Sequence, residues 1–245
     1  MDNKEQGFIP LWDKGPVFCQ SEHFKLGTDS VLLADFVNVG SRKNGIDLGC
    51  GSGILPILLL EKSKGLFMTG LEINPEAASV AEKNLTENRL DGRGKIICGD
   101  IKACRESFRT GEFDLVVANP PYFPEGSGKE SPDFGQAVSR GEKLCTLEDV
   151  CSAAAYLLKT GGIFCLVHRA ERLGDVICTL RAKGLEPKLL RTVSHDITKP
   201  PSLILCEARR GGAPGMRILP PLILRSTDGT ETAETLRIYH REDLP

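Results

Sequence analysis

The sequence predicts an α/β fold built on a largely parallel sheet, and three observations support this. Short apolar runs alternate with helical segments along the middle of the chain, as in consecutive β–α–β units. A glycine-rich turn, DLGCGSG, joins the first apolar run to the first of these helices. Acidic and amide residues directly follow the later apolar runs, at the strand ends where such sheets bind ligands.

The strands of this sheet are predicted from apolar runs that are bounded by turn residues. Parallel strands are expected over residues 45–51, 66–73, 95–100, 113–120 and 163–169, with two further strands over 187–195 and 202–211. The fourth run ends in Asn-Pro-Pro-Tyr, and a Pro-Pro pair cannot continue sheet pairing because proline lacks the amide hydrogen.

Helix signals separate the strands. Helices are expected over residues 54–62, 74–90, 146–162 and 171–184. Asn74 is placed to cap the second helix, with Pro75 at its first helical position. Thr146 is the expected N-cap of the third helix and Gly161 its expected C-cap.

Composition limits the class of protein. The chain has 245 residues, is 40% hydrophobic and carries a net charge of −2, as ordinary globular domains do. No apolar run reaches the roughly 20 residues that a membrane helix needs, and the N-terminus lacks the layout of a signal peptide. The nine cysteines form no C-x-x-C pair or zinc-type cluster. We therefore expect a cytoplasmic protein without a membrane span or a metal.

Two long segments have an unusual composition. Residues 123–145 are rich in Gly, Ser, Pro and charge, and a loop this long within a compact domain is usually functional or disordered. Because it follows Asn-Pro-Pro-Tyr, we expect it to gate a substrate. Residues 159–217 are basic, which fits either an anionic polymer or a solvated surface.

Glycines and acids at the strand ends indicate a nucleotide site. Gly49, Gly51 and Gly53 would let the backbone turn tightly and a ligand approach it closely. Their G-x-G-x-G spacing differs from the G-x-G-x-x-G of dinucleotide enzymes. Glu72 ends the second strand, where an acid binds ribose hydroxyls, and Asp100 ends the third, where a carboxylate can accept from an adenine amino group. Each residue alone could also be a simple turn residue.

The segment Asn119-Pro120-Pro121-Tyr122 would suit methyl transfer to a planar amino group. The lone pair of such a nitrogen is delocalised, so acceptors for both amino hydrogens would localise and aim it. The Asn119 side-chain oxygen and the Pro120 carbonyl can be those acceptors, and Tyr122 can stack on the ring. The alternative is that the segment only terminates a strand.

DLGCGSG, LEINP, CGDI and NPPY, in this order, resemble the S-adenosylmethionine-dependent methyltransferases of the seven-stranded Rossmann-like class. The resemblance covers residues 27–211 and implies a mostly parallel sheet with an antiparallel last strand. It also implies S-adenosyl-L-methionine as cofactor. The loop that begins at Asp47 would lie under its methionine and ribose, while Glu72 would hold the ribose and Asp100 the adenine; Asn119 would lie beside it.

The segment FKLGTDSVLLADFV, residues 24–37, is similar to the K-x-G-T-D-x-x-L-L segment of the bacterial family that methylates adenine 37 of a valine tRNA. This resemblance implies that Thr28 and Asp29 lie at the methionine end of the cofactor; one of them could instead cap a helix. The stretch after the motif retains Arg140 but otherwise departs from that family.

The expected function is N6-methylation of an adenine in structured RNA, with tRNA as the favoured substrate. Three alternatives stay open: a protein-glutamine N5-methyltransferase, a DNA adenine methyltransferase, and a non-catalytic nucleotide- or RNA-binding module. The expected organisation is an N-terminal segment on the cofactor site (1–40), a methyltransferase domain (41–217) and a C-terminal extension (218–245). The oligomeric state is not predicted.

Overall fold

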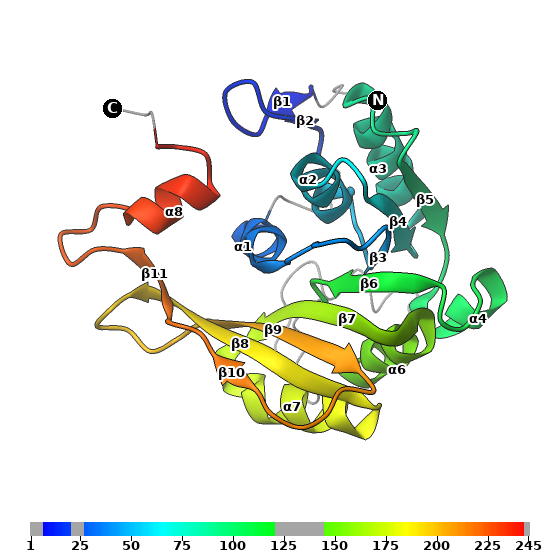
Figure 1. Cartoon of the computed structure of the whole chain (residues 1–245). Coiled ribbons are helices and arrows are strands. Elements are labelled where there is room, and N and C mark those ends of the chain that lie inside the picture. Colours follow the sequence, from blue (N-terminus) through cyan, green and yellow to red (C-terminus); the bar gives the residue numbers. More distant parts are fainter. Residues whose placement is uncertain (1–6, 21–26, 121–144, 243–245) are drawn as a thin grey trace, which may run out of the picture.

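The computed structural model describes residues 7–20, 27–120 and 145–242 and is centred on one large sheet (Figure 1). Its strands are β3 (Asn44–Leu48), β4 (Phe67–Glu72), β5 (Gly94–Cys98), β6 (Phe113–Ala118), β7 (Leu158–Arg169), β8 (Leu185–Asp196), β9 (Leu203–Arg210), β10 (Arg217–Ile218) and β11 (Leu222–Arg225). Their order across the sheet is β10-β8-β9-β7-β6-β3-β4-β5, and β11 also pairs with β8.

The strand directions confirm the predicted fold class. Strands β7, β6, β3, β4 and β5 pair in parallel, while β9 is antiparallel to both β7 and β8. Strands β3 to β9 are therefore the expected mostly parallel sheet with an antiparallel last strand. The short strands β10 and β11, which the sequence did not predict, extend it parallel to β8.

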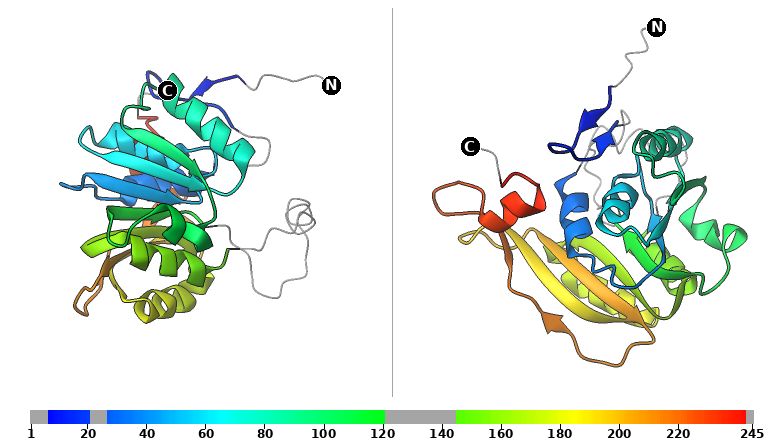
Figure 2. Two further views of the ribbon diagram at one scale, coloured as in Figure 1. Left: turned by 90° about the vertical axis from the view of Figure 1, so that its right-hand side faces the viewer. Right: turned by 45° about the horizontal axis from the view of Figure 1, so that its top comes forward.

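Helices cover both faces of the sheet (Figures 1 and 2). One face carries α1 (Thr28–Phe36), α2 (Ile54–Lys62) and α3 (Pro75–Glu87), and the other carries α4 (Cys104–Ser107), α6 (Leu147–Leu157) and α7 (Leu173–Ala182). On the first face, buried Leu33 and Ile57 pack in one apolar cluster with Leu115 and Ile163 of the sheet. The apolar strand residues are thus buried on both sides, which explains their nearly continuous apolar runs.

The two predicted N-caps are confirmed, but the predicted C-cap Gly161 is wrong. Asn74 accepts hydrogen bonds from two backbone amides of α3, and Thr146 forms a capping box with Asp149 at α6. Gly161, the predicted C-cap of α6, instead lies within β7, with φ of 81°. The register of β7 against β6 shifts at this point. The positive φ of Gly161 therefore belongs to a bulge-like irregularity within the strand.

The two ends of the described chain meet beside α1. The hairpin of β1 (Ile9–Pro10) and β2 (Val17–Phe18) precedes α1, and α8 (Ala233–Ile238) ends the fold. Trp12 stacks on His240 with 4.0 Å between ring centroids. Arg237 of α8 makes two hydrogen bonds with the Asp35 carboxylate of α1. The proposed division at residues 40 and 217 stays a prediction.

Asn84 of α3 and Asn88, the C-cap of this helix, bind the N-terminal strand β2 and the residue after it. Asn84 accepts from the Cys19 amide and donates to the Cys19 carbonyl, each at 2.8 Å. Asn88, one turn later, makes the same two kinds of bond with Val17. Asn84 also donates to the Ser52 carbonyl in the glycine turn, so one buried amide connects the N-terminal segment to that turn.

Substitution of Asn84 by alanine is expected to lower the free energy of unfolding by about 2–4 kcal/mol, because it removes three hydrogen bonds of a fully buried amide. Asn88→Ala is the matched control, since it spares these bonds and should cost less. Chemical denaturation gives the energies, and limited proteolysis within residues 7–20 reports release of β2. Equal stability of the two variants would contradict this role of Asn84.

In the described part of the chain, no helix combines the length and the apolar character that crossing a membrane requires.

Candidate active site at the carboxyl edge of the sheet

Parallel pairing brings the predicted site residues to one edge of the sheet. Strands β6, β3, β4 and β5 are consecutive neighbours, so their carboxyl ends lie side by side. The glycine turn follows β3, Glu72 ends β4, Asp100 follows β5 and Asn119 follows β6. The structure therefore places a turn, two carboxylates and an amide along this edge, called here the carboxyl edge.

The glycine turn depends on left-handed backbone conformations. Gly49, Gly51 and Gly53 have φ of 78°, 53° and 86°, which residues with side chains rarely adopt. At Gly53 a Cβ atom would also lie 3.0 Å from that of Ala81 on α3. The turn can therefore pack closely on α3, while Gly49 at its start remains exposed.

Glu72 holds the glycine turn as well as ending β4. Its Oε2 accepts from the Gly51 amide at 2.8 Å, and its Oε1 accepts from the Asn74 amide at 2.9 Å. The side chain is buried, with 4% exposure. Each carboxylate oxygen can accept more than one hydrogen bond, so the predicted bonds to ribose hydroxyls are compatible with these two. The bonds to the turn were not predicted.

Asp47 is a buried carboxyl group under the same turn. It is 1% exposed, and among the described residues its Oδ1 has no hydrogen-bond partner. Burial and the negative charge of Glu72 raise the pKa of Asp47 well above its usual value. Burial, with Asp47 and Glu72, likewise raises the pKa of the Cys50 thiol. An unpaired acceptor in a negative environment fits a cofactor with cationic and hydroxyl groups, as S-adenosylmethionine has.

Asp47→Asn is expected to stabilise the ligand-free protein at pH 8 by about 2 kcal/mol, since it removes a buried carboxyl group whose ionisation is disfavoured in the folded chain. A carboxyl group with a raised folded-state pKa favours folding below its ordinary pKa, and this contribution is lost as pH rises through the raised value. The advantage of the variant should therefore shrink toward pH 4. Chemical denaturation across this range measures it.

The exposed carboxyl group of Asp91 provides the matched control for this comparison. Asp91→Asn should change the free energy of unfolding little at either pH, because its charge is solvated in both the folded and the unfolded chain. A lower unfolding free energy for Asp47→Asn than for the wild type at pH 8 would contradict the account of Asp47.

Asp100 is oriented by the backbone that follows it. Its Oδ1 accepts from the Lys102 amide at 2.8 Å, which caps the short 3₁₀ turn Ile101–Ala103. The Lys102 ammonium lies 3.9 Å from Oδ2. The carboxylate is partly exposed at the carboxyl edge and keeps acceptor positions for a ligand, as its predicted contact with adenine requires.

Asn119 is half-buried at the end of β6 and is followed by the buried Pro120. Its Nδ2 donates to the Ser30 Oγ of α1 at 3.0 Å. The side-chain oxygen lies on the other branch of the amide and is the predicted acceptor for a substrate amino group. Tyr122, predicted to stack on the substrate, and the proposed gating segment up to residue 144 lie outside the described residues.

Thr28 and Asp29 form the first turn of α1. The predicted alternative, a capping role, is wrong, because the helix begins at Thr28 and Gly27 is its N-cap. The Thr28 hydroxyl donates to the Asp29 carboxylate at 3.2 Å. Burial raises the pKa of Tyr239, the nearby Asp29 carboxylate raises it further, and a Thr28 hydrogen bond opposes both. The C-terminal extension therefore reaches this turn, and the proposed contact with the cofactor stays a prediction.

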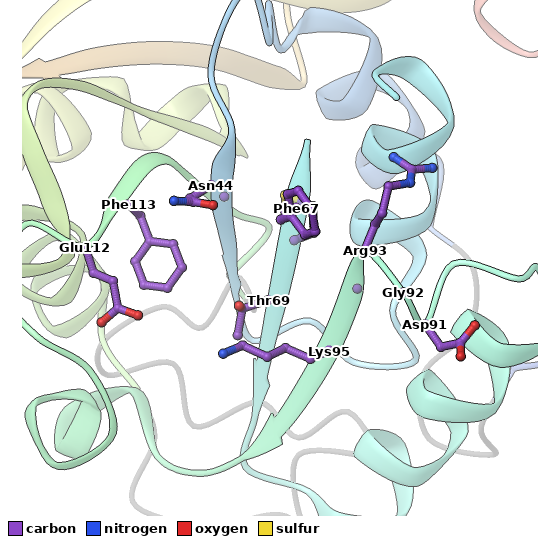
Figure 3. A pocket seen from close by; sticks show the side chains of 12 residues that line it. Asn44, Phe67, Thr69, Asp91, Gly92, Arg93, Lys95, Glu112 and Phe113 are labelled. Atoms are coloured by element: carbon purple, nitrogen blue, oxygen red, sulfur yellow. The ribbon is translucent and has the colours of Figure 1, made fainter. Parts of the chain in front are cut away.

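A pocket among the described residues lies elsewhere, at the amino edge of the sheet (Figure 3). It has a volume of about 340 Å³ and is lined by the first residues of three strands, among them Asn44, Phe67 and Gly94. It therefore lies opposite the carboxyl edge and outside the predicted site. Within the described residues, no group of three His, Cys, Asp or Glu side chains could hold a metal ion.

Several contributors to the site were not predicted from the sequence. Asn84 lies on α3 with buried Ala77 and Ala81, and Asn88 is the C-cap of this helix; two amides near such small apolar residues were an available signal. Ser30 had no such signal, because its partner lies 89 residues away. Tyr239 lies farther still along the sequence from the first turn of α1.

Comparison with known proteins finds sequence relatives of this chain. Residues 9–177 match the methyltransferase small domain family. The tRNA1(Val) (adenine(37)-N6)-methyltransferase of Dickeya chrysanthemi is 30% identical over 189 residues, covering 77% of this chain and 74% of the relative. The protein of the same name from Porphyromonas gingivalis (strain ATCC 33277) is 31% identical over 194 residues, covering 76% and 74%.

Solved structures agree on the fold. The crystal structure of a predicted O-methyltransferase from Agrobacterium tumefaciens superimposes with a TM-score of 0.72 at 19% identity, over 88% of this chain and 97% of that one. At this identity the likeness supports the fold alone. Together with the sequence relatives, it leads to one conclusion: the chain belongs to the methyltransferase small domain family, in the branch that contains the tRNA1(Val) (adenine(37)-N6)-methyltransferases.

Proposed function

We propose that this protein transfers a methyl group from S-adenosylmethionine to the N6 amino group of an adenine in tRNA. The observation that carries the proposal is Asn119, which ends β6 at the same edge as Glu72 and Asp100. Its Nδ2 donates to Ser30, and its oxygen lies on the other branch of the amide, where this proposal has it accept from an amino group of the substrate.

The carboxylates of this edge bind the cofactor in this proposal. S-adenosylmethionine supplies a methyl group on a positively charged sulfur, which leaves readily. Glu72 accepts from the ribose hydroxyls while it holds Gly51, and Asp100 accepts from the adenine amino group. Asp47 supplies a buried acceptor under the turn, where its Oδ1 can accept a hydrogen bond from the ligand.

The acceptors on Asn119 and Pro120 orient the substrate nitrogen. The Asn119 oxygen takes one amino hydrogen and the Pro120 carbonyl takes the other, so the lone pair is localised and directed at the methyl group. Fixed acceptors of this kind lower the barrier because they need no reorganisation during the reaction. Stacking of the base on Tyr122 remains part of the proposal.

A tRNA substrate is supported by the names of the relatives and by charge near the site. The curated relatives are named for methylation of adenine 37 in tRNA1(Val). Arg169 ends β7, the neighbour of β6, and Lys199 follows β8 at the same edge of the sheet; both are exposed. Exposed cations at this place suit a phosphate backbone.

The test is transfer of labelled methyl groups from S-adenosylmethionine to unmodified tRNA, followed by mass spectrometry of the nucleosides. The expected product is N6-methyladenosine in tRNA, and it should be absent with Asn119→Ala. DNA oligonucleotides and a glutamine-containing protein substrate are the comparison arms. If labelled methyl groups appear in the DNA or in the protein substrate and none appear in tRNA, the proposal is wrong. The protein would then be a DNA adenine methyltransferase or a protein-glutamine methyltransferase.

A further inference from the structure

Ser30 connects helix α1 to the proposed catalytic residue. It lies in the first turn of α1 and is 6% exposed, so its hydroxyl is removed from bulk water. Its Oγ lies 3.0 Å from Asn119 Nδ2 and accepts a hydrogen bond from it. The two residues are 89 positions apart, and the contact joins the helical layer to the end of β6.

This hydrogen bond affects which atom Asn119 presents. The amide has a donor on one branch and an acceptor on the other, and its terminal torsion has broad, roughly twofold preferences. With Nδ2 directed at Ser30, the oxygen points along the other branch. A rotation of the amide by half a turn would instead present two donors to an amino group and repel it.

Helix α1 is held firmly enough for Ser30 to act in this way. Lys62 of α2 donates to three carbonyls at the end of α1, those of Ala34, Asp35 and Val37, at 2.9, 2.6 and 2.8 Å. Arg237 of α8 binds the Asp35 carboxylate with both of its terminal nitrogens. Buried leucines also fix the helix on the sheet. The position of the Ser30 hydroxyl is therefore set by groups outside the site.

We propose that Ser30 is a positioning residue for methyl transfer, which holds the Asn119 amide so that its oxygen faces the substrate amino group. The inference rests on the proposed function and adds a residue to it. Ser30 itself contacts neither substrate nor cofactor in this account, so its effect should appear in the rate of the bound complex and leave binding unchanged.

The primary test uses Ser30→Ala and Ser30→Cys in single-turnover transfer to tRNA. The rate constant at saturating substrate should fall about fivefold to tenfold in both, the factor expected from one lost hydrogen bond. The KM for tRNA and the affinity for S-adenosylhomocysteine should stay at wild-type values. Ser30→Thr, which keeps the hydroxyl, should restore most of the rate.

Ser194→Ala is the matched control, because Ser194 is also a buried serine but lies in β8, away from Asn119. It should keep the wild-type rate. Chemical denaturation of every variant identifies any that fail to fold. Ser30→Cys keeps an atom at the place of Oγ but replaces the hydroxyl by a weakly hydrogen-bonding thiol, so it tests the hydroxyl even if Ser30→Ala is destabilised.

A double-mutant cycle separates positioning from a general structural effect. In an Asn119→Ala background, Ser30→Ala should lower the rate no further, since the group that it orients is gone. If Ser30→Ala lowers the rate by the same factor in the Asn119→Ala background as in the wild type, the inference is wrong. If Asn119→Ala lowers the rate and Ser30→Ala does not, only the positioning role fails; if Asn119→Ala keeps the wild-type rate, the proposed function of the site fails as well.

Discussion

Replacement of Asn119 by alanine is expected to lower the rate of methyl transfer by about 10²–10³-fold, the usual cost of losing one preorganised polar group in an active site. The variant keeps the Pro120 carbonyl as an acceptor but has lost the second one, so the substrate lone pair is neither localised nor aimed. Asn119 is only half-buried, and β6 remains paired on both sides, so the fold should persist.

Single-turnover transfer from labelled S-adenosylmethionine to unmodified tRNA measures this loss, and calorimetry with S-adenosylhomocysteine should show unchanged affinity. Asn38→Ala, at an exposed position after α1, is the control for an amide removed from the surface. If Asn119→Ala transfers methyl groups at nearly the wild-type rate, Asn-Pro-Pro only terminates β6 and the proposed chemistry is wrong.

Glu72→Ala is expected to have the largest effect on cofactor affinity. Each charge-assisted hydrogen bond to a ribose hydroxyl contributes roughly 1.5–3 kcal/mol, so the dissociation constant should rise by at least about tenfold. The structure adds a second cost, because the variant also releases the amides of Gly51 and Asn74. The glycine turn should loosen, and the free energy of unfolding should fall.

Calorimetry with S-adenosylhomocysteine and chemical denaturation separate these two effects. Glu87→Ala, at an exposed position on α3, removes a solvated carboxylate and should change neither quantity. If the cofactor affinity of Glu72→Ala is unchanged, Glu72 only holds the glycine turn and does not bind the ribose.

The parts of the fold that depend on local signals were predictable. Buried runs such as residues 113–118 mark the strands, and caps such as Asn74 and Thr146 mark the helix starts, because each depends on residues within one turn of the chain. The site followed from topology, since parallel strands put Glu72, Asp100 and Asn119 at one edge once their order is known.

The remaining features depend on partners distant in the sequence. Gly161 has the positive φ of a C-cap, but tertiary pairing of β7 with β6 uses that conformation inside a strand. Strand β10 is two residues long, too short to produce an alternating pattern. The contact of Ser30 with Asn119 depends on how α1 docks, which no local pattern encodes.

The ion pair between Asp35 and Arg237 joins residues 202 positions apart, and this separation has a consequence for synthesis of the protein. At about 5–20 residues per second, a ribosome delivers Arg237 some 10–40 seconds after Asp35. During that interval the nascent chain can already contain Ser30 and Asn119, while α1 still lacks its contact with α8. Anchoring of α1 by α8 therefore waits until residue 237 has been synthesised, and a ribosome stalled before that residue would carry a nascent chain whose first helix is incompletely anchored.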